Sequence, residues 1–107
     1  MKATYWQRGE SLDYVNETTA VIEANTIIDL GTRIGVAGTS INPGEKGSLH
    51  VTGVYEIAKT GEAEIAMGAA VYFDGNGITN ATGGTLAGYA AEKAVADALV
   101  VLVKLQG

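Results

Sequence analysis

The clearest pattern of apolar and polar positions in the chain runs from Leu49 to Lys59. The apolar positions on one face of this stretch are Leu49, Val51, Tyr55 and Ile57. Alternation with a period of two predicts a half-buried strand. Eleven extended residues would span roughly 36 Å, whereas a typical strand has about 5–6 residues. We therefore expect one long strand, bent at Gly53, that is shared between two parts of one curved sheet.

Shorter apolar runs, each ended by turn residues, precede this stretch. They predict strands over residues 12–17, 20–23, 26–30 and 33–37. The last two runs are separated by Gly31-Thr32, and a two-residue connection that begins with glycine predicts a hairpin with a type II′ turn. The only proline of the chain lies in Asn42-Pro43-Gly44-Glu45, which predicts a loop.

A second hairpin is expected after the long strand. Residues 70–74 predict a strand that stops at Asp74-Gly75-Asn76-Gly77, the strongest turn signal in the chain, and the chain then returns over residues 78–81. Residues 62–67 have helical propensity but are only about two turns long. For them the sequence leaves two alternatives open, a short strand or one helical turn.

The C-terminal part also allows two interpretations. Residues 90–99 are rich in alanine and suit a helix on propensity alone. The alternating apolar residues that follow are mostly valine, which favours strands over residues 86–93 and 99–105 with a turn near Asp97. We adopt the second interpretation as the expectation.

These elements add up to seven to ten short strands with frequent turns. They predict an all-β chain, a small single-domain β-barrel or sandwich with glycine-rich turns and at most a short helical turn. Fifteen glycines and one proline agree with many tight turns. A length of 107 residues suits one domain over residues 1–107, with residues 1–10 as an N-terminal arm.

Composition and charge narrow the range of functions. The chain is 47% hydrophobic and 18% charged, as expected of a globular protein. Twelve acidic against seven scattered basic residues give a net charge of −5, which argues against direct contact with nucleic acid. Cysteine is absent, and no run approaches the ~20 apolar residues of a membrane span. Without the apolar core of a signal peptide near the N-terminus, we expect synthesis in a cytoplasm and no membrane contact.

Residues for catalysis are scarce, and we expect no enzyme, no cofactor and no metal site. His50 is the only histidine and falls on the polar side of the long strand, where an ordinary surface or interface role is expected. Residues 53–60 come close to a phosphate-binding P-loop, but Ala58 stands where the motif needs its second glycine. The stretch alternates like a strand, and Gly61 follows where a helix should begin. A strand that ends in a turn explains these residues better than a nucleotide site.

Two further features need an interpretation. Asn16-Glu17-Thr18 fits the glycosylation pattern, but without a secretory signal the match has little meaning. Tyr5 and Trp6 are large aromatic residues close to the N-terminus. Such residues are either buried in the core or form contacts with a partner, since both are frequent at interfaces. Together with Arg8 they are the residues that we expect to contact a partner protein or a neighbouring subunit.

The order of segments resembles the phage capsid cement (head decoration) protein family, formerly described as a domain of unknown function. The segments that carry the resemblance are Tyr5-Trp6-Gln7-Arg8-Gly9-Glu10, Leu30 to Ala37, Pro43 to Gly47, Val51 to Lys59, Gly68 to Asp74, Gly88-Tyr89-Ala90 and Val101 to Leu105. They cover nearly the whole chain but consist of structural glycines and apolar strands, not of a catalytic signature. Some relatives are labelled as recombinases, and the altered P-loop pattern gives no support for carrying ATPase activity over.

The resemblance implies a structural virion protein of a bacteriophage or prophage. Such a capsid decoration or cement protein sits on the outer surface of the head, binds the major capsid protein and stabilises contacts between its subunits. By analogy with the local three-fold positions of many heads, a homotrimer is the expected oligomer. The alternatives are another structural virion component, in the tail or fibre base, or a nucleotide-binding recombinase-like factor.

Overall fold

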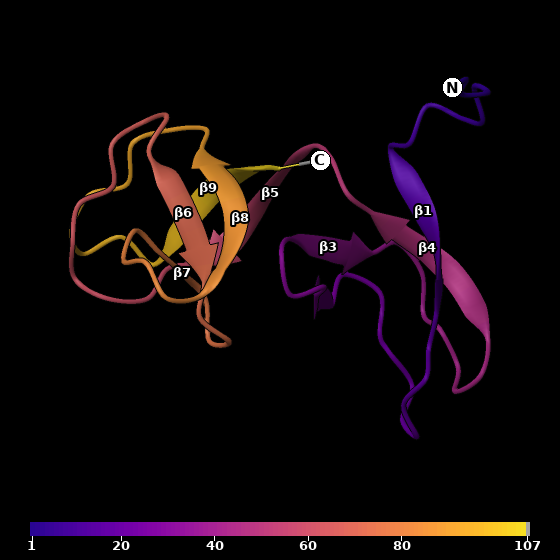
Figure 1. Ribbon diagram of the computed structural model, residues 1–107. Helices are drawn as coiled ribbons and strands as arrows, with labels where there is room; N and C mark the ends of the chain where they lie inside the picture. The colour runs from indigo at the N-terminus through magenta and orange to yellow at the C-terminus, as the bar shows by residue number, and fades with distance from the viewer. Residues whose placement is uncertain (107) are drawn as a thin grey trace.

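The computed structural model describes residues 1–106 as two antiparallel β-sheets that lie side by side (Figure 1). The first sheet has the order β1 (Ser11–Val15), β4 (Lys46–His50), β3 (Ile34–Ala37) and β2 (Ile27–Asp29). The second has the order β5 (Val54–Ala58), β9 (Val100–Leu105), β8 (Thr85–Ala90), β6 (Ala70–Phe73) and β7 (Ile78–Thr79). No helix forms within residues 1–106. The all-β prediction is confirmed.

The sheets are not closed into a barrel. The second sheet curls until the segment after β5 meets β7, but the only contact of strand type there is one isolated parallel bridge between Lys59 and Ile78 among the described residues. The thickness of the molecule is 21 Å in one direction, against 40 and 39 Å in the other two. The molecule is therefore not a barrel but a pair of open sheets that pack against each other.

The stretch from Leu49 to Lys59 is not one long strand of one sheet. It is divided between β4 and β5, which belong to different sheets. The predicted bend at Gly53 is present, because this residue has φ +112°, a conformation that side chains disfavour. The bend is therefore a crossing from one sheet to the other.

Most of the remaining local predictions are confirmed, but residues 20–23 form no strand, since only Ile22 joins an isolated bridge, to Ile41. β2 and β3 form the expected hairpin, in which the Leu30 amide donates to the Arg33 carbonyl at 2.8 Å and Gly31 has φ +91°. β6 and β7 pair around the turn at Asp74–Gly77. Residues 62–67 are neither a strand nor a helical turn, because only Ile65 joins a strand-type bridge, to Ala94.

One apolar core connects the two sheets. It is built mainly from the inner faces of the second sheet, with Val71, Val101, Val103 and Leu105 almost fully buried. Ile34 and Val36 of β3 belong to the same cluster, so the first sheet shares this core. Burial of these side chains is the main source of stability.

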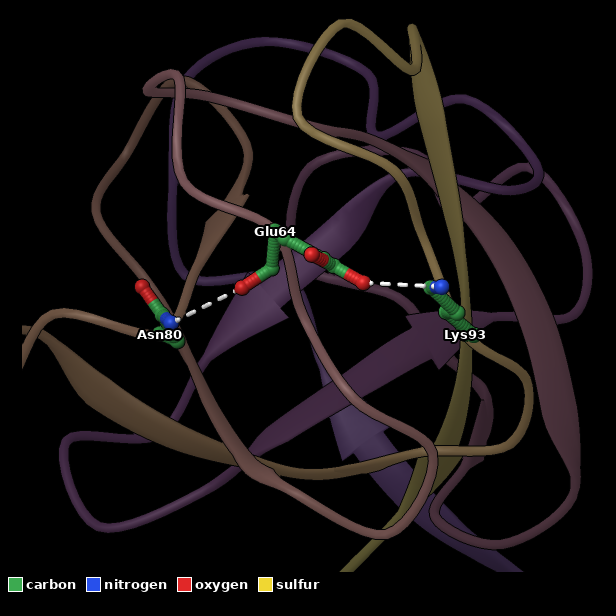
Figure 2. A network of polar contacts seen from close by, with 3 residues as sticks. All are labelled: Glu64, Asn80 and Lys93. Carbon is green, nitrogen blue, oxygen red and sulfur yellow. Dashed lines mark hydrogen bonds and ion pairs between the residues drawn. The ribbon is translucent and has the colours of Figure 1, made fainter.

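Polar contacts fix the long connections around the core. Figure 2 shows Glu64 between Lys93 and Asn80. Its carboxylate Oε1 lies 2.9 Å from Lys93 Nζ, and its carbonyl accepts a hydrogen bond from Asn80 Nδ2 at 3.4 Å. The ion pair joins the connection between β5 and β6 to that between β8 and β9, beside the Ile65–Ala94 bridge, and the hydrogen bond from Asn80 joins it to the connection between β7 and β8. The ion pair is exposed and contributes little energy by itself.

Candidate functional site

The N-terminal segment projects from β1 and forms no regular structure over residues 1–9 (Figure 1). Tyr5 is 78% exposed and Trp6 88% exposed, so neither is buried in the core. Arg8 Nη2 lies 3.6 Å from Glu10 Oε1 in an exposed pair, which holds the arm only weakly. The three residues chosen from the sequence thus lie together on one exposed segment.

A groove of about 600 Å³ lies where the two sheets meet. Ile27 and Val36 of the first sheet and Tyr55, Ile57 and Phe73 of the second line its apolar part. Asn25, Glu56 and the turn Gly75-Asn76-Gly77 give it a polar rim. A volume of this size is in the range of about 300–1,000 Å³ that is typical of ligand pockets.

The groove opens beside the outer edge of β5, which pairs with a strand on one side only. Gly53 accepts a hydrogen bond from the Leu105 amide at 2.9 Å, and the Lys59 amide donates to the Leu99 carbonyl at 2.9 Å. Backbone groups alternate in direction along an antiparallel strand. Since residues 53 and 59 face β9, the N–H and C=O groups of Val54 and Glu56 face the open edge, where a further strand can add.

Sequence reasoning did not find this groove. Its walls come from residues that lie far apart in the chain, such as Ile27, Tyr55 and Phe73. Alternation identified Tyr55 as an inward-facing residue but gave no information about which strand lies opposite. A groove between two sheets depends on long-range packing, so no local signal could have found it.

The P-loop-like residues 53–60 form the strand β5 and its end, as alternation predicts. Lys59 Nζ donates to the carbonyls of Ala96 and Gly61 at 2.9 and 3.2 Å. Thr60 Oγ1 donates to Asp74 Oδ2 at 2.7 Å. The lysine and the threonine that a P-loop would turn toward phosphate and Mg²⁺ here connect loops of the fold.

Asp74 organises the turn between β6 and β7. The hydroxyl of Thr60 is the largest influence that lowers the pKa of this carboxyl below its ordinary 3.8, and the amides of Asn76 and Gly77 add to it. These amides donate to Asp74 Oδ1 at 2.8 and 2.9 Å. Hydrogen bonds to a carboxylate favour its charged form.

Replacing Thr60 with valine is expected to raise the pKa of Asp74 toward 3.8, because the strongest hydrogen bond to the carboxylate is lost. Carbon-detected NMR titration of the side-chain carboxyl measures this value directly. A carboxyl whose pKa is lower in the folded chain stabilises the fold above its unfolded pKa and loses this effect as the pH falls through the folded pKa. The difference in stability between wild type and variant should therefore shrink below about pH 4.

Thr39→Val is the matched control, since Thr39 is exposed and lies in the loop after β3. This control should leave the Asp74 titration unchanged. An unchanged pKa in Thr60→Val would show that the hydroxyl does not stabilise the charged carboxylate.

The other candidate chemistry does not assemble into a site. His50 is half-buried on β4, and its ring lies against Gly38. Within residues 1–106, no group of three or more histidine, aspartate or glutamate side chains could hold a metal ion. Over the same residues, no helix is long and apolar enough to cross a membrane.

Comparison with known proteins agrees with the resemblance that the segments suggest. A family model described as phage cement protein matches residues 6–105, nearly the whole chain. Comparison with curated proteins gives no match, and comparison with solved structures gives none either. The match begins at Trp6 and ends at Leu105, the last residue of β9, so it spans both sheets and part of the arm. The chain belongs to the phage cement protein family.

Proposed function

We propose that this chain is a capsid decoration protein that binds the outer surface of a phage head and stabilises contacts between major capsid protein subunits. The family match over residues 6–105 is the observation that carries the proposal. Its role is structural and not enzymatic, and the protein is made in the cytoplasm of the host bacterium before it joins the virion. A body only 21 Å thick in one direction suits a protein that lies flat on a shell.

We place the contact with the decorated shell on Tyr5, Trp6 and Arg8. Two exposed aromatic side chains beside a basic residue have the composition of interface hot spots. A homotrimer at local three-fold positions would present three such arms at once. Three weak contacts then add through multivalency, so that decoration is stable although each arm binds weakly.

Deleting residues 2–8 is expected to weaken binding to phage heads at least about hundredfold while leaving the fold intact. The fold should survive because these residues are exposed and pair with no strand. Co-sedimentation of the purified protein with undecorated expanded heads measures binding, and thermal unfolding measures the fold. Unchanged affinity of the truncated protein would refute the role of the arm.

A pair of substitutions provides a matched comparison for the deletion. Trp6→Ala removes an aromatic residue from the arm, whereas Tyr89→Ala removes one that is 46% exposed on β8. Only the first should weaken binding to heads. An equal loss for both would indicate that the outer face of the second sheet contributes as much as the arm.

The position of the protein in the virion tests the proposal as a whole. Electron microscopy of virions that carry a labelled copy should show label over the entire head. Label confined to the tail or fibre base would identify a different structural component. Calorimetric titration with ATP and Mg²⁺ should give no heat of binding, and micromolar affinity would instead support a nucleotide-binding factor.

A further inference from the structure

The arm and the body of the molecule carry opposite charges. Lys2 and Arg8 are two of the seven basic residues, whereas all twelve acidic residues lie from Glu10 onward. The rest of the chain therefore has a net charge of −7, against −5 for the whole chain. A basic segment with two exposed aromatic residues is complementary to an acidic body that has an apolar groove.

The open edge of β5 offers one environment on each of its two faces. Tyr55 and Ile57 point to the inner face and line the groove, together with Phe73. Val54 is 54% exposed and lies with Glu56 on the outer face. In a strand added to this edge, every second side chain would enter the apolar groove. The side chains between them would lie on the outer face, beside Val54 and Glu56.

We propose that the arm of one copy adds as a strand to the β5 edge of a second copy, with Tyr5 in the groove between the sheets. Alternation then sends Trp6 and Arg8 to the other face, where Val54 and Glu56 lie. Cross-strand contacts between an aromatic and a β-branched residue, and between opposite charges, stabilise such pairs. The proposal thus accounts for all three exposed arm residues at once.

The direction of the arm favours a second copy as its partner. A row of paired residues crosses the first sheet from Ser11 through His50 and Val36 to Ile27. Ile27 and Val36 line the groove, but Ser11 begins the strand at the opposite edge, about 14 Å away by strand spacing. The arm leaves from that opposite edge and points away from the second sheet (Figure 1). It is therefore directed toward a neighbour.

The contact joins two different surfaces of the same protein, the arm and the β5 edge. Such a head-to-tail interface forms a ring when the rotation between copies closes. In such a ring the arms occupy the grooves of neighbouring copies, so each arm has to leave its groove before it contacts a head in the way proposed above. The arm–groove contact itself is a property of the free protein and can be tested without heads.

Trp6 provides a direct reporter, because it is the only tryptophan in the chain. Its fluorescence moves to shorter wavelength when the indole leaves water. Across a dilution series of the full-length protein from about 1 mM to about 1 μM, we expect a shift to shorter wavelength at high concentration that disappears on dilution. Sedimentation velocity should show the larger species over the same range, and added salt should weaken it.

Charge reversal identifies the two surfaces. Arg8→Glu and Glu56→Arg should each raise the dissociation constant at least about tenfold, because each places like charges opposite one another. An equimolar mixture of the two variants should regain association, since the altered arm of one then meets the altered edge of the other. Glu17→Arg is the matched control, because Glu17 is exposed on the loop after β1 and should have no specific effect.

Three results would overturn the inference. Emission of Trp6 that is fully exposed at every concentration would show that the arm remains free. A shift to shorter wavelength in a protein that sediments as a monomer at every concentration would show that the arm folds onto its own chain. Failure of the mixture to regain association would show that Arg8 and Glu56 are not partners. Head binding by these variants is measured separately. Absence of association between free copies would therefore not contradict the decoration role, and loss of head binding would not contradict the arm–groove contact.

Discussion

Replacing Gly88 with alanine is expected to destabilise the protein by at least about 4 kcal/mol. Gly88 lies on β8 with φ +147°, opposite a shift in register between Val71 and Tyr72. A β-carbon there would collide with the carbonyl oxygen of Lys104 on β9, a backbone atom that cannot move aside alone. The variant therefore combines an unfavourable backbone conformation with separation of the two central strands of the second sheet.

Urea-induced unfolding measures this loss, and Gly83→Ala separates its two causes. Gly83 also has a positive φ, +121°, but no atom lies within 4 Å of the position of its β-carbon. We expect Gly83→Ala to lower the free energy of unfolding by only about 1–2 kcal/mol, which is typical of backbone strain alone. If both variants lost the same stability, the close approach of β8 to β9 would not be important for the fold.

These glycines differ in whether their roles could be predicted from the sequence. Turn glycines such as Gly31 and Gly75 were predictable, because short-range patterns specify tight turns. The role of Gly88 depends on the pairing of β8 with β9, which places residue 88 opposite Leu105. The sequence predicted a strand over residues 86–93 but could not identify its partner, so the close contact was not visible in the sequence.

The long strand expected from Leu49 to Lys59 failed for a similar reason. The alternation of side chains continues through the crossing, because the inward positions keep the same parity on both sides. The hydrogen-bond partners change, however, since the Val51 amide donates to Glu10 and the Gly53 carbonyl accepts from Leu105. Periodicity records which face a side chain occupies, but it contains no information about which strand lies beside it.

The two parts of the candidate site also differ in how much of each the sequence reveals. The sequence drew attention to Tyr5 and Trp6 as large aromatic residues near the N-terminus, but it left open whether they are buried or form contacts. The groove that we propose as the receptor of the arm could not be recognised in the sequence, because Ile27 and Tyr55 come together only when two sheets pack. A contact between copies thus combines one surface that is local in sequence with another that is created by the fold.

Replacing Asn16 with aspartate is expected to destabilise the protein by about 3–5 kcal/mol at neutral pH. Asn16 is fully buried, and its Nδ2 donates to the carbonyls of Ala20 and Ile41, each at 2.8 Å. Its Oδ1 accepts from the amide and the hydroxyl of Thr18 at 2.9 and 2.6 Å. An aspartate keeps the acceptor, but its charged form removes one donor from each of these carbonyl oxygens and buries a negative charge beside them. The Asn-X-Thr pattern therefore reflects a buried hydrogen-bond network that joins two loops.

The pH dependence of this variant distinguishes a buried charge from a mere change of shape. Burial raises the pKa of an aspartate, so the charged form is the one that the fold disfavours. The loss relative to wild type should therefore be smallest below about pH 4, where the protonated carboxyl still donates one hydrogen bond, and should grow as the pH rises. Asn42→Asp is the matched control, because Asn42 is exposed in the neighbouring loop and should change stability by less than about 0.5 kcal/mol. Equal, pH-independent losses for the two variants would mean that the Asn16 network does not hold the loops together.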